Sequence, residues 1–155
     1  VLSISLLLLN SAVHRDFTFD FSWLGLFLFL VGYIVLIVLH EASHLIGFVL
    51  FAKVPWRSLD FGINLQLGVA YATTSEAVQN KAMRKVLILP FWTTGVLPAV
   101  IAISINSPLL AFLSAWLMAG AVGDFTMIRE LRTVDDDAWI KDDPELPKLY
   151  IFEHK

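Results

Sequence analysis

Cysteine is absent from this chain of 155 residues, which excludes disulfide bonds, thiol catalysis and thiolate metal sites. Charged residues are scarce as well, at 16% of the chain compared with about 25% in an ordinary soluble domain. The 11 basic residues form no stripe that could follow a phosphate backbone, so we expect no nucleic-acid partner. Apolar residues make up 57% of the chain, and its mean hydropathy is +0.73. This composition excludes an ordinary water-soluble globule.

Long apolar segments divide the chain and predict its fold class. Residues 21–52, 83–105 and 109–128 are each long enough to cross a bilayer core, which needs about 20 residues, whereas 1–13 are too few. Pro90 and Pro98 are expected to kink the helix over 83–105 without breaking it. We predict an all-α integral membrane bundle of three full transmembrane helices and a partial first one. Residues 1–132 form the membrane domain, and 133–155 form an acidic tail.

Basic residues predict the orientation of this bundle, because Lys and Arg accumulate in cytoplasmic loops. Ten of the 11 lie between the second and third segments or after the fourth, and only Arg15 lies on the other side. The ten are Lys53, Arg57, Lys81, Arg84, Lys85, Arg129, Arg132, Lys141, Lys148 and Lys155. We therefore place the 53–85 loop and the C-terminus in the cytoplasm.

Residues 62–72 alternate between apolar and small or polar side chains, which predicts a small cytoplasmic β element, a half-buried strand or hairpin. Two roles stay open: an amphipathic sheet that rests on the membrane surface, or an edge strand that holds an extended peptide by backbone pairing. Asn64 and Gln66 are candidate substrate-binding residues, since their amides could donate hydrogen bonds to a peptide or to a developing oxyanion.

The second apolar segment contains an H-E-x-x-H motif at residues 40–44. His40 and His44 are four residues apart, so both imidazoles project from one helical face and can bind one zinc ion. Glu41, one residue further round the helix, can act as the general base. His44 lies nine residues before Lys53, roughly 13 Å along a helix, so the expected metal lies within the membrane.

A catalytic zinc needs a third protein ligand, and Asp124 is the candidate. It is the acidic residue embedded in the fourth apolar run, where a carboxylate must be paired or metal-bound. Small residues around it, among them Gly123, and Gly47 in the second segment would allow these two helices to approach closely. Glu130 is next in line but looks like a solvated charge at the membrane boundary. The third histidine of metzincins is replaced by Leu50.

Other interpretations of this constellation stay open. Intramembrane His and Glu also occur in metal or proton transporters, and a buried histidine pair can be purely structural. The rival to an enzyme is therefore a non-catalytic membrane protein, either a transporter or a scaffold that binds transmembrane helices. Such a protein would keep its transport or binding when Glu41 is replaced, and would hydrolyse nothing.

Several motifs together resemble a known family: Leu39-His40-Glu41-Ala42-Ser43-His44, Leu89-Pro90-Phe91, Val96-Leu97-Pro98 and Gly123-Asp124. Over about residues 21–153 the chain is similar to the zincin peptidase family of small bacterial membrane proteins, which in turn resemble site-2-type intramembrane metalloproteases. Members of the family often end in an Asp-His-Pro stretch and a short aromatic strand. Residues 142–144 and 149–152 match these loosely, with Asp143 in place of the histidine. In site-2 proteases the ligand Asp precedes a Gly, whereas here Gly123 precedes Asp124.

Motif and resemblance lead to one expected function. The chain is expected to be a zinc-dependent metalloendopeptidase of a bacterial plasma membrane, with Zn²⁺ held by His40, His44 and Asp124 and with Glu41 as general base. Its expected partners are the lipid bilayer and a transmembrane or membrane-adjacent peptide or protein substrate.

Overall fold

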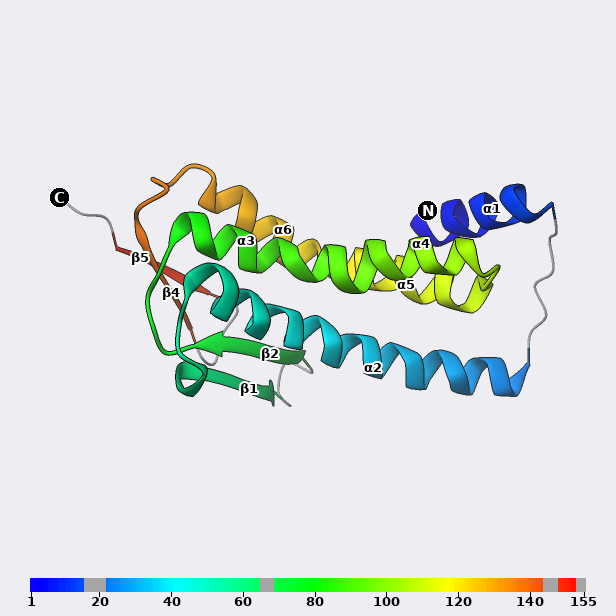
Figure 1. The fold of residues 1–155 in the computed structure, drawn as a ribbon, viewed down its shortest axis with the longest axis horizontal. Helices are drawn as coiled ribbons and strands as arrows, with labels where there is room; N and C mark the ends of the chain where they lie inside the picture. Colours follow the sequence, from blue (N-terminus) through cyan, green and yellow to red (C-terminus); the bar gives the residue numbers. More distant parts are fainter. Residues whose placement is uncertain (16–21, 65–68, 144–147, 153–155) are drawn as a thin grey trace. The chain divides into compact units, whose positions relative to one another are not determined.

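The computed structural model describes residues 1–15, 22–64, 69–143 and 148–152. The fold is mostly helical, with two small antiparallel sheets (Figure 1). Its residues form two compact units, which are considered separately. The first comprises residues 1–39 and 91–122, and the second comprises residues 40–90 and 123–155.

Three helices among the described residues are long and apolar enough to cross a membrane: Trp23–Ala52, Asn80–Ser104 and Pro108–Leu131. They agree closely with the predicted segments 21–52, 83–105 and 109–128. The first consists of α2 (Trp23–Gly47) and the π-helical turn η1 (Phe48–Ala52). The second consists of α3 (Asn80–Pro90), η3 (Phe91–Val96) and α4 (Leu97–Ser104), and the third of α5 (Pro108–Gly120) and α6 (Val122–Leu131). The helix α1 (Leu2–His14) is shorter, as predicted.

The prolines of the second long helix have the predicted effect. Pro90 ends α3, and the backbone then widens into the π-helical segment η3 before Pro98 opens α4. A proline has no N–H to donate and clashes with the preceding turn, so a regular α-helix cannot continue through it. The helix is therefore locally deformed at Pro90 but not interrupted.

In the first unit, α1 packs against α4 and α5 (Figure 1). Two polar contacts support this packing. The buried Asn10 amide donates to Asn106 Oδ1 over 2.8 Å, and His14 Nε2 donates to the Ile103 carbonyl over 2.6 Å. Aromatic side chains of α2 and α5 pack together in the same unit, with ring centroids 5.4–6.0 Å apart; they are Phe29, Tyr33, Phe112 and Trp116.

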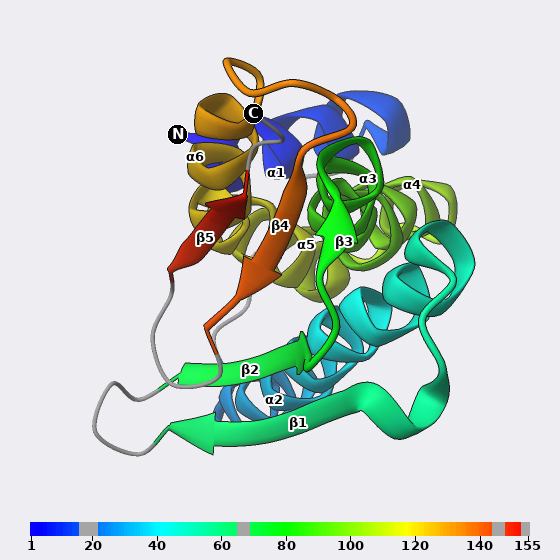
Figure 2. The same ribbon diagram turned by 90° about the vertical axis from the view of Figure 1, so that its left-hand side faces the viewer.

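The second unit contains the predicted β element as a hairpin of β1 (Leu59–Asn64) and β2 (Val69–Thr74) (Figure 2). The strands pair in antiparallel register from Leu59 opposite Thr74 to Asn64 opposite Val69. The hairpin begins three residues before the predicted range 62–72 and ends two residues after it. Phe61 and Ile63, two residues apart on β1, are exposed. One face of the hairpin is therefore apolar and uncovered among the described residues.

A second sheet, which the sequence analysis did not predict, joins residues far apart in the chain. Its strands β3 (Val78–Gln79), β4 (Trp139–Asp142) and β5 (Leu149–Phe152) are antiparallel in the order β3-β4-β5 (Figure 2). The resemblance implied only the last strand. β3 has two residues and β4 four, so neither is long enough for an alternating pattern to be recognised.

The core of the second unit lies between α3, α6, η1 and the three-stranded sheet. Val86 and Ile140 are completely buried in it, and Met83 and Leu131 are 1% exposed. The complete cluster is Phe48, Val54, Val78, Met83, Val86, Leu87, Ile128, Leu131 and Ile140. These contacts hold α3 and α6 in one packed body with the last turns of α2.

Candidate metal centre

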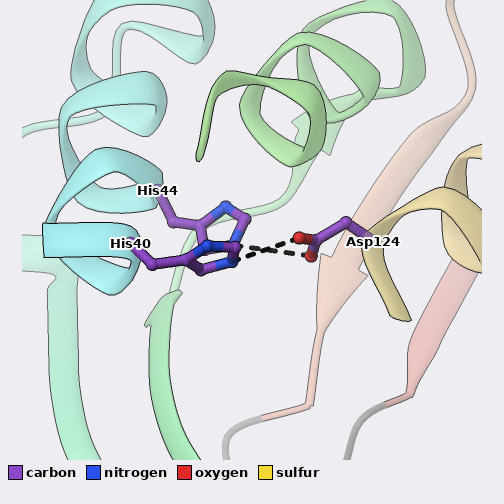
Figure 3. Close-up of side chains that lie close together, drawn as sticks. All are labelled: His40, His44 and Asp124. Carbon is purple, nitrogen blue, oxygen red and sulfur yellow. Dashed lines mark ion pairs between the residues drawn. The ribbon is translucent and has the colours of Figure 1, made fainter. Parts of the chain in front are cut away.

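His40 and His44 lie one turn apart near the C-terminal end of α2, as the i, i+4 spacing predicts (Figure 3). Their rings meet edge to face, with centroids 5.2 Å apart. The His40 side chain is 12% exposed and that of His44 is 9% exposed. Both imidazoles are therefore largely removed from solvent on one face of the helix.

Asp124 faces both imidazoles from the first turn of α6 (Figure 3). One carboxylate oxygen lies 3.2 Å from His40 Nε2, and the other lies 3.5 Å from His44 Nε2. The Asp124 side chain is 16% exposed. Residues 80 positions apart in the sequence thus converge in the second unit, and the structure brings the three predicted ligands together.

The orientation of the His44 ring is set by α3. Its Nδ1 donates a hydrogen bond to the carbonyl of Val86 over 3.2 Å. Because a carbonyl only accepts, Nδ1 carries a proton in this contact, which leaves Nε2, on the side of Asp124, as the nitrogen that would bind a metal. This is the arrangement that outer partners impose on metal-binding histidines. Val86 could not be identified from the sequence, because a backbone carbonyl has no residue signature.

Gly47 makes this contact possible. A Cβ added there would lie 3.2 Å from the Cα of Val86, which is tighter than an ordinary contact. The glycine thus lets α3 approach α2 closely enough for the Val86 carbonyl to reach His44. The predicted close packing of Gly47 against the fourth apolar segment is wrong, because Gly47 packs against α3 instead. A Cβ on Gly123 would meet no atom of the described residues within 4 Å, so Gly123 is not a close contact either.

The three side chains have the donor set of a zinc site, and they lie close enough together to share one ion. One ligand atom from each lies within 4.8 Å of the others, and no other described residues form such a group. With bonds of about 2.0–2.1 Å, two ligands of one tetrahedral zinc lie roughly 3.3–3.4 Å apart. The two His–Asp separations, 3.2 Å to one carboxylate oxygen and 3.5 Å to the other, are close to this value. Two imidazole nitrogens and a carboxylate oxygen also suit zinc chemically.

Glu41 lies close enough to His40, His44 and Asp124 for its charge to interact with all three. It does not belong to the group of possible ligands formed by the described residues. A carboxylate beside the ligands but outside their set is available for proton transfer.

The remaining candidates lie elsewhere. Asn64 is the last residue of β1, opposite Val69, whereas Gln66 lies outside the described residues. Glu130 is exposed on α6 and is not among the clustered groups. The structure therefore favours Asp124 over Glu130 as the third candidate ligand.

Asp142, which the sequence analysis did not single out, also belongs to this unit. It ends β4, and its carboxylate is near enough to His44 for the charges to interact. Burial raises the pKa of Asp142 to about 6, although the Thr73 hydroxyl and the Asp143 backbone favour the ionised form. A second acidic side chain thus lies in the neighbourhood of the cluster, outside the membrane-spanning segments.

Comparison with known proteins identifies the family. Residues 33–139, which include all of the candidate ligands, match the family described as "Putative zincin peptidase". No significant match was found among curated proteins or among solved structures. The family name points to a metallopeptidase and implies zinc, in agreement with the donor set of the cluster. Since the match covers more than two thirds of the chain, the protein belongs to this zincin peptidase family.

Proposed function

We propose that the protein is an intramembrane zinc metalloprotease that hydrolyses peptide bonds of membrane-embedded or membrane-adjacent substrates. The observation that carries the proposal is the convergence of His40, His44 and Asp124 on one point, with Glu41 beside them. Both carrier helices belong to segments that are apolar and long enough to span a membrane. Ionisable groups in such segments are costly, which favours a function over a purely structural role.

His40, His44 and Asp124 would hold the metal through Nε2, Nε2 and a carboxylate oxygen. A zinc ion held there would supply Lewis acidity, which makes water nucleophilic at neutral pH and polarises a carbonyl. Val86 keeps the His44 proton on Nδ1, so that Nε2 stays free to bind.

Glu41 performs the proton transfers. Its carboxylate accepts a proton from the attacking water as the new C–O bond forms at the scissile carbonyl carbon. The same carboxyl then donates that proton to the amide nitrogen as the C–N bond breaks, releasing an amine and a carboxylic acid. One water is consumed for each peptide bond, and Glu41 returns to its starting state.

The hairpin β1–β2 supports a role in substrate binding. A substrate helix hides its amides in internal hydrogen bonds, so it must unwind before a peptide bond can be attacked. In the described part of the chain, β1 pairs with β2 and with no other strand. An extended substrate segment could add to its free edge, with Asn64 and Gln66 as further hydrogen-bond donors.

The distribution of Lys and Arg supports an orientation with the 53–85 loop on the cytoplasmic side. The family resemblance supports a bacterial plasma membrane. In this arrangement the metal centre opens toward the cytoplasm.

The decisive experiment compares wild type, Glu41→Gln and the control Glu130→Gln in detergent and in vesicles. Zinc content and cleavage of a transmembrane reporter peptide are measured for each variant. We expect one zinc per chain in all three, and cleavage by wild type and Glu130→Gln alone. Cleavage by a zinc-loaded Glu41→Gln variant would refute the general-base role. Zinc-dependent transport without hydrolysis would instead favour the transporter.

A further inference from the structure

Asn80, the first residue of α3, is completely buried and binds the end of another helix. Its side-chain Nδ2 donates to the carbonyls of Leu131, Val134 and Asp135 over 2.9, 2.8 and 3.1 Å. The last carbonyls of any helix lack partners within that helix. One amide of α3 thus caps the C-terminal end of α6 and the residues that follow it.

The backbone reinforces this connection. The N–H of Asn80 donates to the Ala138 carbonyl over 2.8 Å, and that of Lys81 donates to the Asp136 carbonyl over 3.0 Å. Two ion pairs, Lys81 with Asp137 and Arg84 with Asp136, cover the same junction, and the carboxylate of each is exposed. Ion pairs at exposed carboxylates contribute little to stability, so the buried Asn80 amide is the main buried side-chain attachment.

The unpaired half of the Asn80 amide is informative. Its Oδ1 is buried and has no hydrogen-bond partner among the described residues. Such an orphaned acceptor destabilises the folded state, because it has lost its hydrogen bonds to water without replacement. A flipped amide would point Oδ1 at three carbonyl oxygens, so the orientation that donates is the one that electrostatics allows. The Asn80 Oδ1 thus stays unpaired because the same amide directs its Nδ2 donors at the three carbonyls.

The same helix α3 also orients the histidine side of the centre. Its Val86 carbonyl binds His44 Nδ1, six residues after Asn80 and roughly 9 Å further along the helix. On α6, Asp124 precedes the capped Leu131 by seven residues, or roughly 10 Å. α3 therefore contacts a ligand of α2 at one point and the helix that carries Asp124 at another.

We propose that Asn80 is a positioning residue for Asp124. By fixing the end of α6 to α3, it holds the Asp124 carboxylate at the distance from His40 and His44 that metal binding requires. The inference rests on the proposed metal centre and adds a determinant of its affinity. Ligands must be held to within about 0.5 Å of their working geometry, and a helix free to slide or rotate exceeds that.

The test is a double-mutant cycle on metal affinity. Zinc dissociation constants are measured by competition with a chromophoric chelator for wild type, Asn80→Ala, Asp124→Ala and the double variant. Loss of an outer partner typically weakens a metal site about 10–100-fold. We expect Asn80→Ala to weaken zinc binding by about this factor when Asp124 is present, and by less than about 2-fold in the Asp124→Ala background.

Two further variants keep the test decisive. Asn10→Ala removes a different buried asparagine amide, in the first unit, and should leave the zinc affinity unchanged. Asn80→Ser retains one donor and should recover part of the affinity; it replaces Asn80→Ala in the cycle if the alanine variant does not fold.

The outcomes separate the two proposals. Equal losses of affinity in both Asp124 backgrounds, or no loss in a folded Asn80 variant, would overturn the positioning role while the metal centre stands. A wild-type chain that binds no zinc would overturn the proposed function, and the positioning role with it.

Discussion

Replacement of Asp124 by alanine should nearly abolish the stabilisation of the protein by zinc. His40 and His44 lie on one helical turn, whereas Asp124 comes from a helix 80 residues later. A metal bound by all three therefore links two distant segments of the folded chain and has no preformed site in the unfolded one. Zinc should bind the native state preferentially and raise the free energy of unfolding.

The size of the effect follows from mass action. With free zinc buffered at 100 times the wild-type dissociation constant, the stabilisation is about 2.7 kcal/mol. Loss of a direct ligand should weaken binding at least as much as loss of an outer partner, which reaches about 100-fold. The same free zinc then equals the dissociation constant of Asp124→Ala, and only about 0.4 kcal/mol remains. For a chain of this size these values correspond to rises in Tm of about 5–11 °C and about 1–2 °C.

The assay is thermal unfolding in detergent, followed by tryptophan fluorescence at fixed free zinc and in excess chelator. Trp139 on β4 lies in the same unit as the metal centre and can report its unfolding. Glu130→Ala is the matched control, because Glu130 is an exposed carboxylate on the same helix. A full zinc-dependent shift in Asp124→Ala, together with loss of the shift in Glu130→Ala, would refute the assignment of the third ligand.

Three further predictions concern the surroundings of the centre. Gly47→Ala should weaken zinc binding about 10-fold by displacing the Val86 carbonyl from His44, measured by chelator competition. Asp142 has a raised pKa of about 6, so its contribution to stability is present below pH 4 and lost as the pH rises through 6. Asp142→Asn should therefore be more stable than wild type at pH 7, by up to about 3 kcal/mol, in denaturant titrations at several pH values. Met83→Ala, at a position 1% exposed, should lower the unfolding free energy by about 2–5 kcal/mol, and the control Met83→Leu by less than about 1.5 kcal/mol.

The long helices could be predicted because their signal is distributed over many residues. Each contains at least 15 apolar residues, so the loss of any one of them would not change the assignment. The hairpin could also be predicted, because apolar side chains alternate with small or polar ones throughout residues 62–72. The sheet β3-β4-β5 was missed because its strands have two to four residues and pair with partners up to 62 positions away. Such pairing is decided by tertiary contacts rather than by local pattern.

The candidate ligands were found for a different reason. His40, Glu41 and His44 have a fixed spacing, and Asp124 is conspicuous as a carboxylate in an apolar run. The groups that orient them left no such signal. The partner of His44 is a backbone carbonyl, and Asn80 looks like an ordinary polar residue at a helix start. A sequence reveals a side chain whose polarity is unusual for its segment. It does not reveal a backbone contact, or a polar side chain of a type that is common at its position.

The distance between the ligands along the chain has a consequence for biosynthesis. Both histidines leave the ribosome long before Asp124, since 80 residues at about 5–20 residues per second take about 4–16 s to translate. The carbonyls that Asn80 binds are translated later still. In the proposed enzyme, a nascent chain therefore carries the general base and two ligands for several seconds without a complete metal site. If the proposed function holds, hydrolysis could begin only after the last long helix has been made, and an incomplete chain would not cleave neighbouring nascent membrane proteins.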